Sequence, residues 1–182
     1  IRFDVSGVTG EIVDAQLDLE VALNNGGGSD PAPKTFTVNV FGLRDDAAGN
    51  DWIEGDLDWN NAPANDDGNE IDTDLAILLG QFIVPAEAVG SNPVLVSFGN
   101  LQSATPDTFI DFLEADTDGL VTFILTRGTG SGSYNLIFAS SERSGYMAPT
   151  LRLATVPEPA TMALLGLATC GLSGYLRKRR RA

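Results

Sequence analysis

The sequence AQLDLEVAL at residues 15–23 decides the fold class. Ala15, Leu17, Leu19, Val21 and Leu23 take every second position, and Gln16, Asp18 and Glu20 separate the first four. Alternation over this length predicts a β-strand with one face buried and the other in solvent. The domain is therefore expected to be built on a half-buried sheet.

The same alternation returns on both sides of this stretch, in segments bounded by turn-forming residues. Further strands are predicted over residues 1–5, 35–43, 76–84, 94–98, 120–127, 134–140 and 149–154. A short helix is expected from Asp107 or Thr108, because the apolar residues that follow have helical spacing. Roughly eight short strands and one helical turn predict an all-β fold, an antiparallel β-sandwich.

Composition excludes several function classes. Residues 1–155 hold six basic and 24 acidic residues, a net charge of −18, which repels nucleic acid and anionic lipid. The chain has no histidine, and its one cysteine, Cys170, lies in the apolar tail. We therefore expect no catalytic residues of the histidine or thiol type, no disulfide in the domain and no bound cofactor.

The C-terminal segment 156–182 has three parts. A triplet, Pro157-Glu158-Pro159, precedes 17 apolar residues at 160–176, which span about 25 Å as a helix. A basic cluster follows, made of Arg177, Lys178, Arg179, Arg180 and Arg181. We expect a helix over about residues 161–179. Because the cations follow its apolar run, this segment is predicted to insert transiently in a membrane, with residues 1–155 facing outward.

This order of triplet, apolar run and cations resembles the PEP-CTERM sorting signal of Gram-negative bacteria. The resemblance implies an exosortase-type processing enzyme as partner. It also implies export to the cell surface, outer envelope or extracellular matrix, with an inner-membrane anchor before processing. The chain starts at Ile1 rather than at Met, so we expect a fragment or a processed form.

Residues 1–154 resemble the DNRLRE domain family, which is related to carbohydrate-binding modules with a jelly-roll sandwich. The segments that carry the resemblance are Ile1–Val5, Ala15–Val21, Val38–Gly42, Trp52–Glu54, Leu57–Pro63, Phe138–Glu142 and Ala148–Leu153. The family has further strands before the equivalent of Ile1, so the resemblance implies a jelly-roll-like sandwich that is truncated at its N-terminal side. It also implies a noncatalytic, extracellular, glycan-associated module.

Two aromatic residues are candidates for ligand binding. Trp52, in a polar neighbourhood, and Tyr146, in the loop 143–147, are expected to be exposed platforms for a polysaccharide, although either can instead pack within its loop. Trp59-Asn60-Asn61-Ala62-Pro63 can also form a sugar site. A core tryptophan followed by asparagines that hold a local turn is the favoured interpretation.

Acidic residues suggest a further hypothesis, a structural calcium ion. Residues 45–74 hold eleven acids and no Lys or Arg, with Asp45, Asp46, Asp51, Asp66, Asp67 and Asp72 as candidate ligands. Asp116-Thr117-Asp118-Gly119 matches a fragment of a calcium loop, and it is also a turn sequence. The alternatives are a solvated acidic surface and a pair of glycosidase carboxylates. Spacing does not identify the metal site.

These observations lead to one expected function and two alternatives. The chain is expected to be a noncatalytic exported surface module (residues 1–155) that associates with glycan or extracellular matrix, followed by its sorting segment (residues 156–182). The first alternative is an accessory domain of a polysaccharide hydrolase or lyase whose catalytic domain lies upstream. The second is a purely structural surface protein.

Overall fold

The computed structural model describes eight strands and one α-helix. It describes residues 1–26, 35–47, 49–58, 60–66, 70–86, 93–99, 108–128 and 134–156. The elements are β1 (Arg2–Asp4), β2 (Glu11–Gly26), β3 (Phe36–Leu43), a 3-10 turn η1 (Glu54–Asp56), β4 (Ala76–Val84), β5 (Val94–Gly99), α1 (Thr108–Glu114), β6 (Leu120–Arg127), β7 (Tyr134–Phe138) and β8 (Thr150–Val156). The expected strands and the expected short helix from residue 108 are all present.

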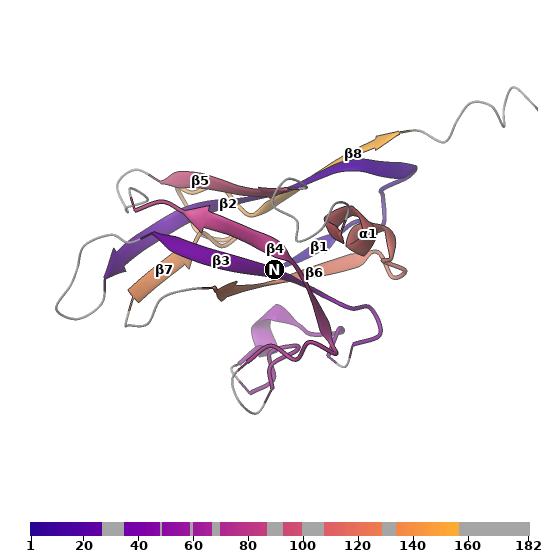
Figure 1. Cartoon of the computed structure of the whole chain (residues 1–182), viewed down its shortest axis with the longest axis horizontal. Coiled ribbons are helices and arrows are strands. Elements are labelled where there is room, and N and C mark those ends of the chain that lie inside the picture. The colour runs from indigo at the N-terminus through magenta and orange to yellow at the C-terminus, as the bar shows by residue number, and fades with distance from the viewer. Residues whose placement is uncertain are drawn as a thin grey trace, which may run out of the picture.

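The strands form two antiparallel sheets. The first sheet has the order β1-β6-β3-β4, and the second has the order β5-β2-β7. Strand β8 also pairs with β2, along residues Glu11–Asp18, whereas β7 pairs along Val21–Gly26. Figure 1 shows β5, β2 and β8 along the upper side of the molecule, while the segment between β3 and β4 projects from the lower side. The predicted all-β sandwich is confirmed, and the finer jelly-roll description stays a prediction.

Strand β2 is longer than its alternating pattern predicts. Two irregularities in its pairing explain the difference, one between Ile12 and Asp14 against β8 and one between Val21 and Leu23 against β7. An extra residue in a ladder shifts the side chains that follow to the opposite face. The period of two therefore breaks near both ends of β2, although the backbone continues as a strand.

An aromatic cluster fills one end of the space between the sheets. Phe109 of α1 is fully buried, with its ring centroid 5.0 Å from that of Phe98 and 5.8 Å from that of Phe123. The ring centroid of Phe112, also in α1, lies 5.7 Å from that of Phe123. The helix thus links β5 of the second sheet to β6 of the first through three rings.

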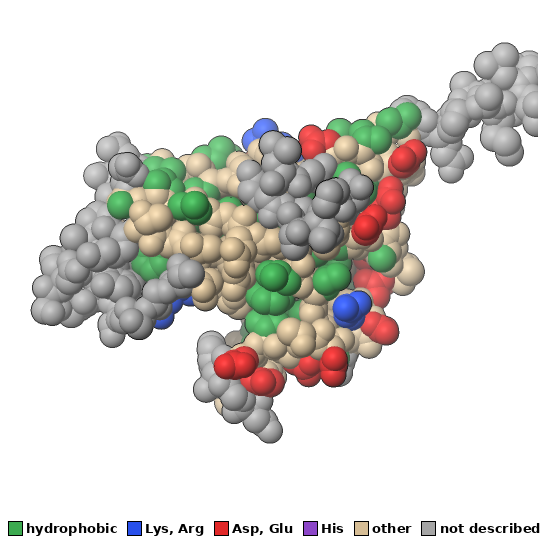
Figure 2. Space-filling model, in the orientation of Figure 1, with side chains coloured by type: hydrophobic (Ala, Val, Ile, Leu, Met, Phe, Trp, Pro, Cys, Tyr) green, Lys and Arg blue, Asp and Glu red, His purple; other side chains and the backbone are tan. Residues whose placement is uncertain are grey.

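The segment between β3 and β4 packs on the outer face of the first sheet. A second, smaller core lies there, formed by Leu43, Ala47, Ala64 and Ala76, with Trp52 and Ile124 packed against it. The acidic residues of this segment lie mostly at its surface, and Figure 2 shows acidic side chains along the lower and right margins of the molecule. Acids at the surface and alanines beneath explain how so charged a segment still packs.

Beside β1, the edge of the first sheet is only partly covered. Strand β1 pairs with residues Leu120–Thr122 of β6, and Ile1 and Phe123 exchange two backbone hydrogen bonds of 2.8 and 2.7 Å. Beyond Phe123, no strand in the described part of the chain pairs with this side of β6. The expected incomplete sandwich, with further strands before Ile1, stays a prediction.

The expected C-terminal helix lies on residues outside the described ranges. Among the described residues, no helix has the length and apolar character needed to cross a membrane.

Gly42 of β3 provides a test of how tightly α1 packs. A Cβ atom added at Gly42 would lie 2.4 Å from the Phe112 ring, so Gly42→Ala forces the ring or the helix to move. We expect this substitution to lower the free energy of unfolding by about 1–3 kcal/mol, measured by urea denaturation. Gly7→Ala is the control, because a Cβ atom there meets nothing within 4 Å. Equal stability of the two variants would contradict the tight packing of α1 on β3.

Candidate functional site

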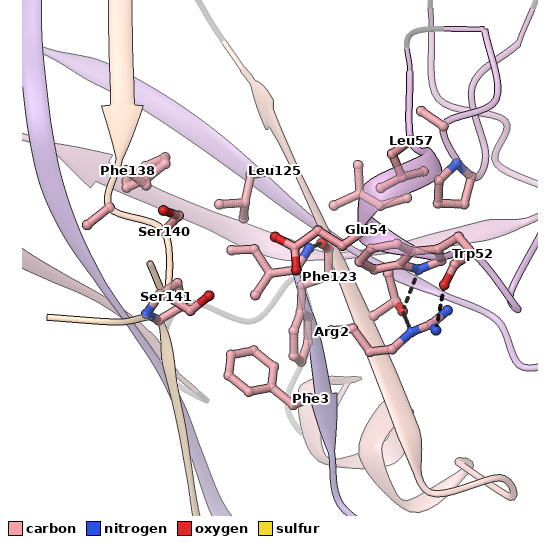
Figure 3. A pocket seen from close by; sticks show the side chains of 17 residues that line it. Arg2, Phe3, Trp52, Glu54, Leu57, Phe123, Leu125, Phe138, Ser140 and Ser141 are labelled. Atoms are coloured by element: carbon pink, nitrogen blue, oxygen red, sulfur yellow. Dashed lines mark hydrogen bonds between the residues drawn. The ribbon is translucent and has the colours of Figure 1, made fainter. Parts of the chain in front are cut away.

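Trp52 is held in place by Arg2 of the first strand. The Arg2 guanidinium lies 4.4 Å from the centroid of the Trp52 ring and donates a 2.9 Å hydrogen bond to the Trp52 carbonyl. It also donates to the carbonyl of Asn50. The indole N–H donates to Thr122 Oγ1 at 3.2 Å, as Figure 3 shows. Trp52 is therefore partly buried and packed, which fits the alternative of a packed side chain better than an exposed platform, and its role in ligand binding stays a prediction.

A groove of about 560 Å³ opens beside this clamp. It runs along the uncovered edge of β6, with Trp52, Leu57 and Pro63 on one side and Phe3 and Phe138 on the other. Figure 3 shows Phe138 and Leu125 across the opening from Leu57 and Trp52. Most of the lining is apolar, so the groove suits an apolar occupant better than a highly hydroxylated one.

Tyr146 is also less exposed than expected. The Arg143 guanidinium lies 4.6 Å from the centroid of the Tyr146 ring, and the ring is partly buried. The next residue, Met147, donates its backbone N–H to the carboxylate of Glu20. Glu20 points outward from β2, because its neighbours Leu19 and Val21 point into the core. The Tyr146 loop is therefore attached to the outer face of the second sheet.

A polar network occupies the centre of that outer face. Asp18 of β2 is fully buried, and its Oδ1 accepts hydrogen bonds from Ser97 Oγ at 2.5 Å and Gln16 Nε2 at 2.6 Å. Arg152 Nε of β8 lies 2.7 Å from Asp18 Oδ2, an ion pair whose N–H is not aligned as a hydrogen bond. Three neighbouring strands thus contribute polar groups to one patch. Sequence alternation predicts that these residues face outward, but it does not predict that they form a hydrogen-bonded network.

The asparagines after residue 58 hold a local turn. The Asn61 side chain accepts a 2.7 Å hydrogen bond from the N–H of Asp58 and donates one to the Asp56 carbonyl at 2.7 Å. The Asp58 carboxylate accepts from the N–H groups of Asn60 and Asn61. The side-chain bonds of Asn61 agree with the favoured interpretation of a local turn, and Trp59 lies outside the described residues.

Three carboxylates from distant parts of the sequence meet at the α1–β6 turn. Asp45, just after β3, lies beside Asp116 and Asp118, with carboxylate oxygens within 4.8 Å of one another. Asp45 Oδ2 accepts hydrogen bonds from the Thr117 N–H at 2.6 Å and from its hydroxyl at 2.8 Å. Asn50 donates to Asp118 at 3.1 Å. Sequence spacing could not reveal this cluster, because it forms only when α1 packs near the end of β3.

Two other candidate calcium ligands are used within their own loops. Asp66 accepts a hydrogen bond from the N–H of Glu70, and Asp72 accepts one from the N–H of Asp74. Asp67 lies outside the described residues. The structure therefore brings together Asp45 and the Asp116–Gly119 turn, which the sequence analysis considered separately.

Burial raises the pKa of Asp116 above its usual value of 3.8, and the nearby charges of Asp45 and Asp118 raise it further. A hydrogen bond from the Gly119 N–H, at 2.9 Å, acts in the opposite direction. The folded protein thus binds this proton more tightly than the unfolded chain does. Asp116 therefore contributes stability at acidic pH that is lost as the pH rises through its folded pKa.

Asp116→Asn tests whether the raised pKa of Asp116 makes the stability of the fold depend on pH. The amide keeps an acceptor for the Gly119 N–H and removes the charge, so the variant should gain stability relative to wild type as the pH rises from acidic to neutral. Urea denaturation at a series of pH values measures the difference. Asp4→Asn is the control of opposite sign, because hydrogen bonds from Ser6 lower the pKa of Asp4. A pH-independent difference for Asp116→Asn would contradict the raised pKa.

The calcium hypothesis stays a prediction with its own test. An ion that binds only the native state raises the melting temperature as its concentration rises. We expect a higher melting temperature in millimolar calcium than in chelator. This difference should be smaller in Asp118→Asn, because the substitution removes one of the three carboxylates. Equal melting temperatures in both conditions would remove calcium from consideration.

Comparison with known proteins identifies the C-terminal segment. Residues 155–181 match the family model of the PEP-CTERM protein-sorting motif. No curated protein matches the chain. The motif indicates an exported protein of a Gram-negative bacterium that an exosortase-type enzyme processes and that is sorted to the cell surface.

Proposed function

We propose that the sandwich of residues 1–155 is a noncatalytic surface module that associates with a neutral polysaccharide of the extracellular matrix. The sorting motif supports this proposal, because it delivers the domain to the place where such polymers occur. The observation that carries it is the polar outer face of the second sheet, bordered by the aromatic loop of Tyr146.

The chemistry of this face suits a hydroxylated chain. Gln16 and Glu20 are partly exposed on it, and the Arg152 side chain is 61% exposed although it also contacts Asp18. These groups offer donors and acceptors to sugar hydroxyls, while Asp18 contacts Gln16 and Arg152 from beneath. Tyr146 adds an aromatic surface for the C–H face of a sugar ring.

The charge of the domain indicates the class of ligand, and the shape of the sheet face indicates the binding affinity. Its net charge of −18 disfavours an anionic polysaccharide. A flat sheet face buries little of its ligand, so dissociation constants should be micromolar to millimolar, about −8 to −4 kcal/mol.

A pull-down on insoluble neutral polysaccharides tests the proposal. We expect retention of wild type and a clear loss of retention for Tyr146→Ala, because the substitution removes the aromatic surface beside the polar face. Trp52→Ala is the matched aromatic control, because Trp52 lies in the β6 groove.

Each of the other outcomes would indicate a different site or function. Loss with Trp52→Ala alone would move the site to the β6 groove. No retention of wild type would favour a purely structural surface protein. Release of soluble sugar would favour the enzyme alternative, and circular dichroism of each variant would exclude unfolding as the cause.

A further inference from the structure

Arg152 is held on the outer face of the second sheet by charge rather than by its hydrogen bonds. It lies opposite Gln16 in the β2–β8 ladder, and its Nε is 2.7 Å from Asp18 Oδ2. This carboxylate oxygen nevertheless has no aligned donor. Within the described part of the chain, the Arg152 side chain makes no hydrogen bond to another protein group, and it is 61% exposed. Its N–H groups can therefore donate to a ligand.

Asp18 is fixed in the sheet through its other oxygen. Oδ1 accepts hydrogen bonds from Ser97 Oγ at 2.5 Å and from Gln16 Nε2 at 2.6 Å, and the side chain is fully buried. A buried carboxylate is costly unless a positive charge compensates it. Within the residues that the structure describes, Arg152 is the basic side chain that does so. The need to compensate Asp18 thus keeps the guanidinium at one place on the outer face.

Contact with Asp18 also changes what Arg152 attracts. An isolated guanidinium on a surface binds carboxylates strongly, often through two parallel hydrogen bonds. A negative charge 2.7 Å away cancels most of its field but leaves its N–H groups in place. Asp14 and Glu20 alternate with the inward residues of β2 on the same face as Asp18, and they add negative charge around it. Donors without net positive charge suit the hydroxyl and ether oxygens of an uncharged sugar.

We propose that Arg152 is the specificity-determining residue of this face, and that Asp18 is a positioning residue that makes the face select neutral polysaccharides over anionic ones. This inference rests on the polysaccharide function proposed above. Arg152 donates to sugar oxygens directly. Asp18 is fully buried, so it acts through Arg152, both by holding the guanidinium and by cancelling its charge.

Asp18→Asn tests the role of the cancelled charge. The amide oxygen still accepts from Ser97 and Gln16, while the charge of Arg152 is no longer compensated. The probes are beads of cellulose, mannan and dextran, each with a carboxymethylated form of the same polymer. We expect retention of the full chain on carboxymethylated beads, relative to neutral beads, to rise by about twofold to fivefold at low salt. This rise should disappear at high salt, because salt screens the uncompensated charge.

Two further variants separate this role from general effects of charge and folding. Asp74→Asn changes the net charge by the same amount at an exposed position before β4, in the first sheet, and should leave the ratio unchanged. The double variant Asp18→Asn/Arg152→Gln removes both charges and leaves no uncompensated carboxylate. It should lose the carboxymethyl preference of Asp18→Asn and bind neutral beads about twofold to tenfold more weakly than wild type. Urea denaturation of each variant checks that the fold is kept.

Specific results would overturn the inference. One is a bead ratio for Asp18→Asn equal to that for Asp74→Asn, and another is retention of the double variant equal to that of wild type. Either result, together with retention of wild type on neutral beads and its loss in Tyr146→Ala, would leave the proposed function standing and remove only the roles of Asp18 and Arg152. No retention of wild type on any neutral bead would overturn the proposed function and this inference together.

Discussion

The register of β2 against three partner strands is the constraint on which the rest of the structure depends. One side of β2 pairs with β5, and the other side is divided between β8 and β7. The inward residues Leu17, Leu19 and Val21 are fully or almost fully buried, so a slip of one residue would bring Asp18 and Glu20 into the core. The same register places Asp18 opposite both Ser97 and Thr150, so the outer polar face follows directly from packing of the inner one.

Packing of α1 has a second consequence, away from the core. Phe109 fits between Phe98 and Phe123, and this contact fixes where the chain leaves the helix. The turn that follows then meets the end of β3, so Asp116 and Asp118 come close to Asp45. Repulsion among these carboxylates opposes folding, while the aromatic contacts favour it. The position of the acidic cluster is thus a result of core packing rather than of local sequence.

The fold was more predictable from sequence than the candidate sites were. Period-two alternation identified the strands, and it breaks where the pairing is irregular, near the bulges of β2 and between β3 and β4. The sequence could not decide between an exposed and a packed Trp52, because Arg2 is 50 residues away in sequence and covers the ring only after β1 pairs with β6. The groove likewise depends on residues from β1, β6 and the end of β7. A contact between distant segments leaves no periodic signal in the sequence.

The domain and its sorting signal meet without a linker. The sorting motif begins at Thr155, which still belongs to β8 and pairs with Ile12, while Val156 pairs with Glu11. Pro157 follows directly, and because proline has no N–H it cannot extend the ladder. Both Thr155 and Val156 are exposed, whereas Leu151 and Leu153 are the β8 residues that pack against the main core. Separation of the last two residues of β8 would therefore remove no side chain from that core.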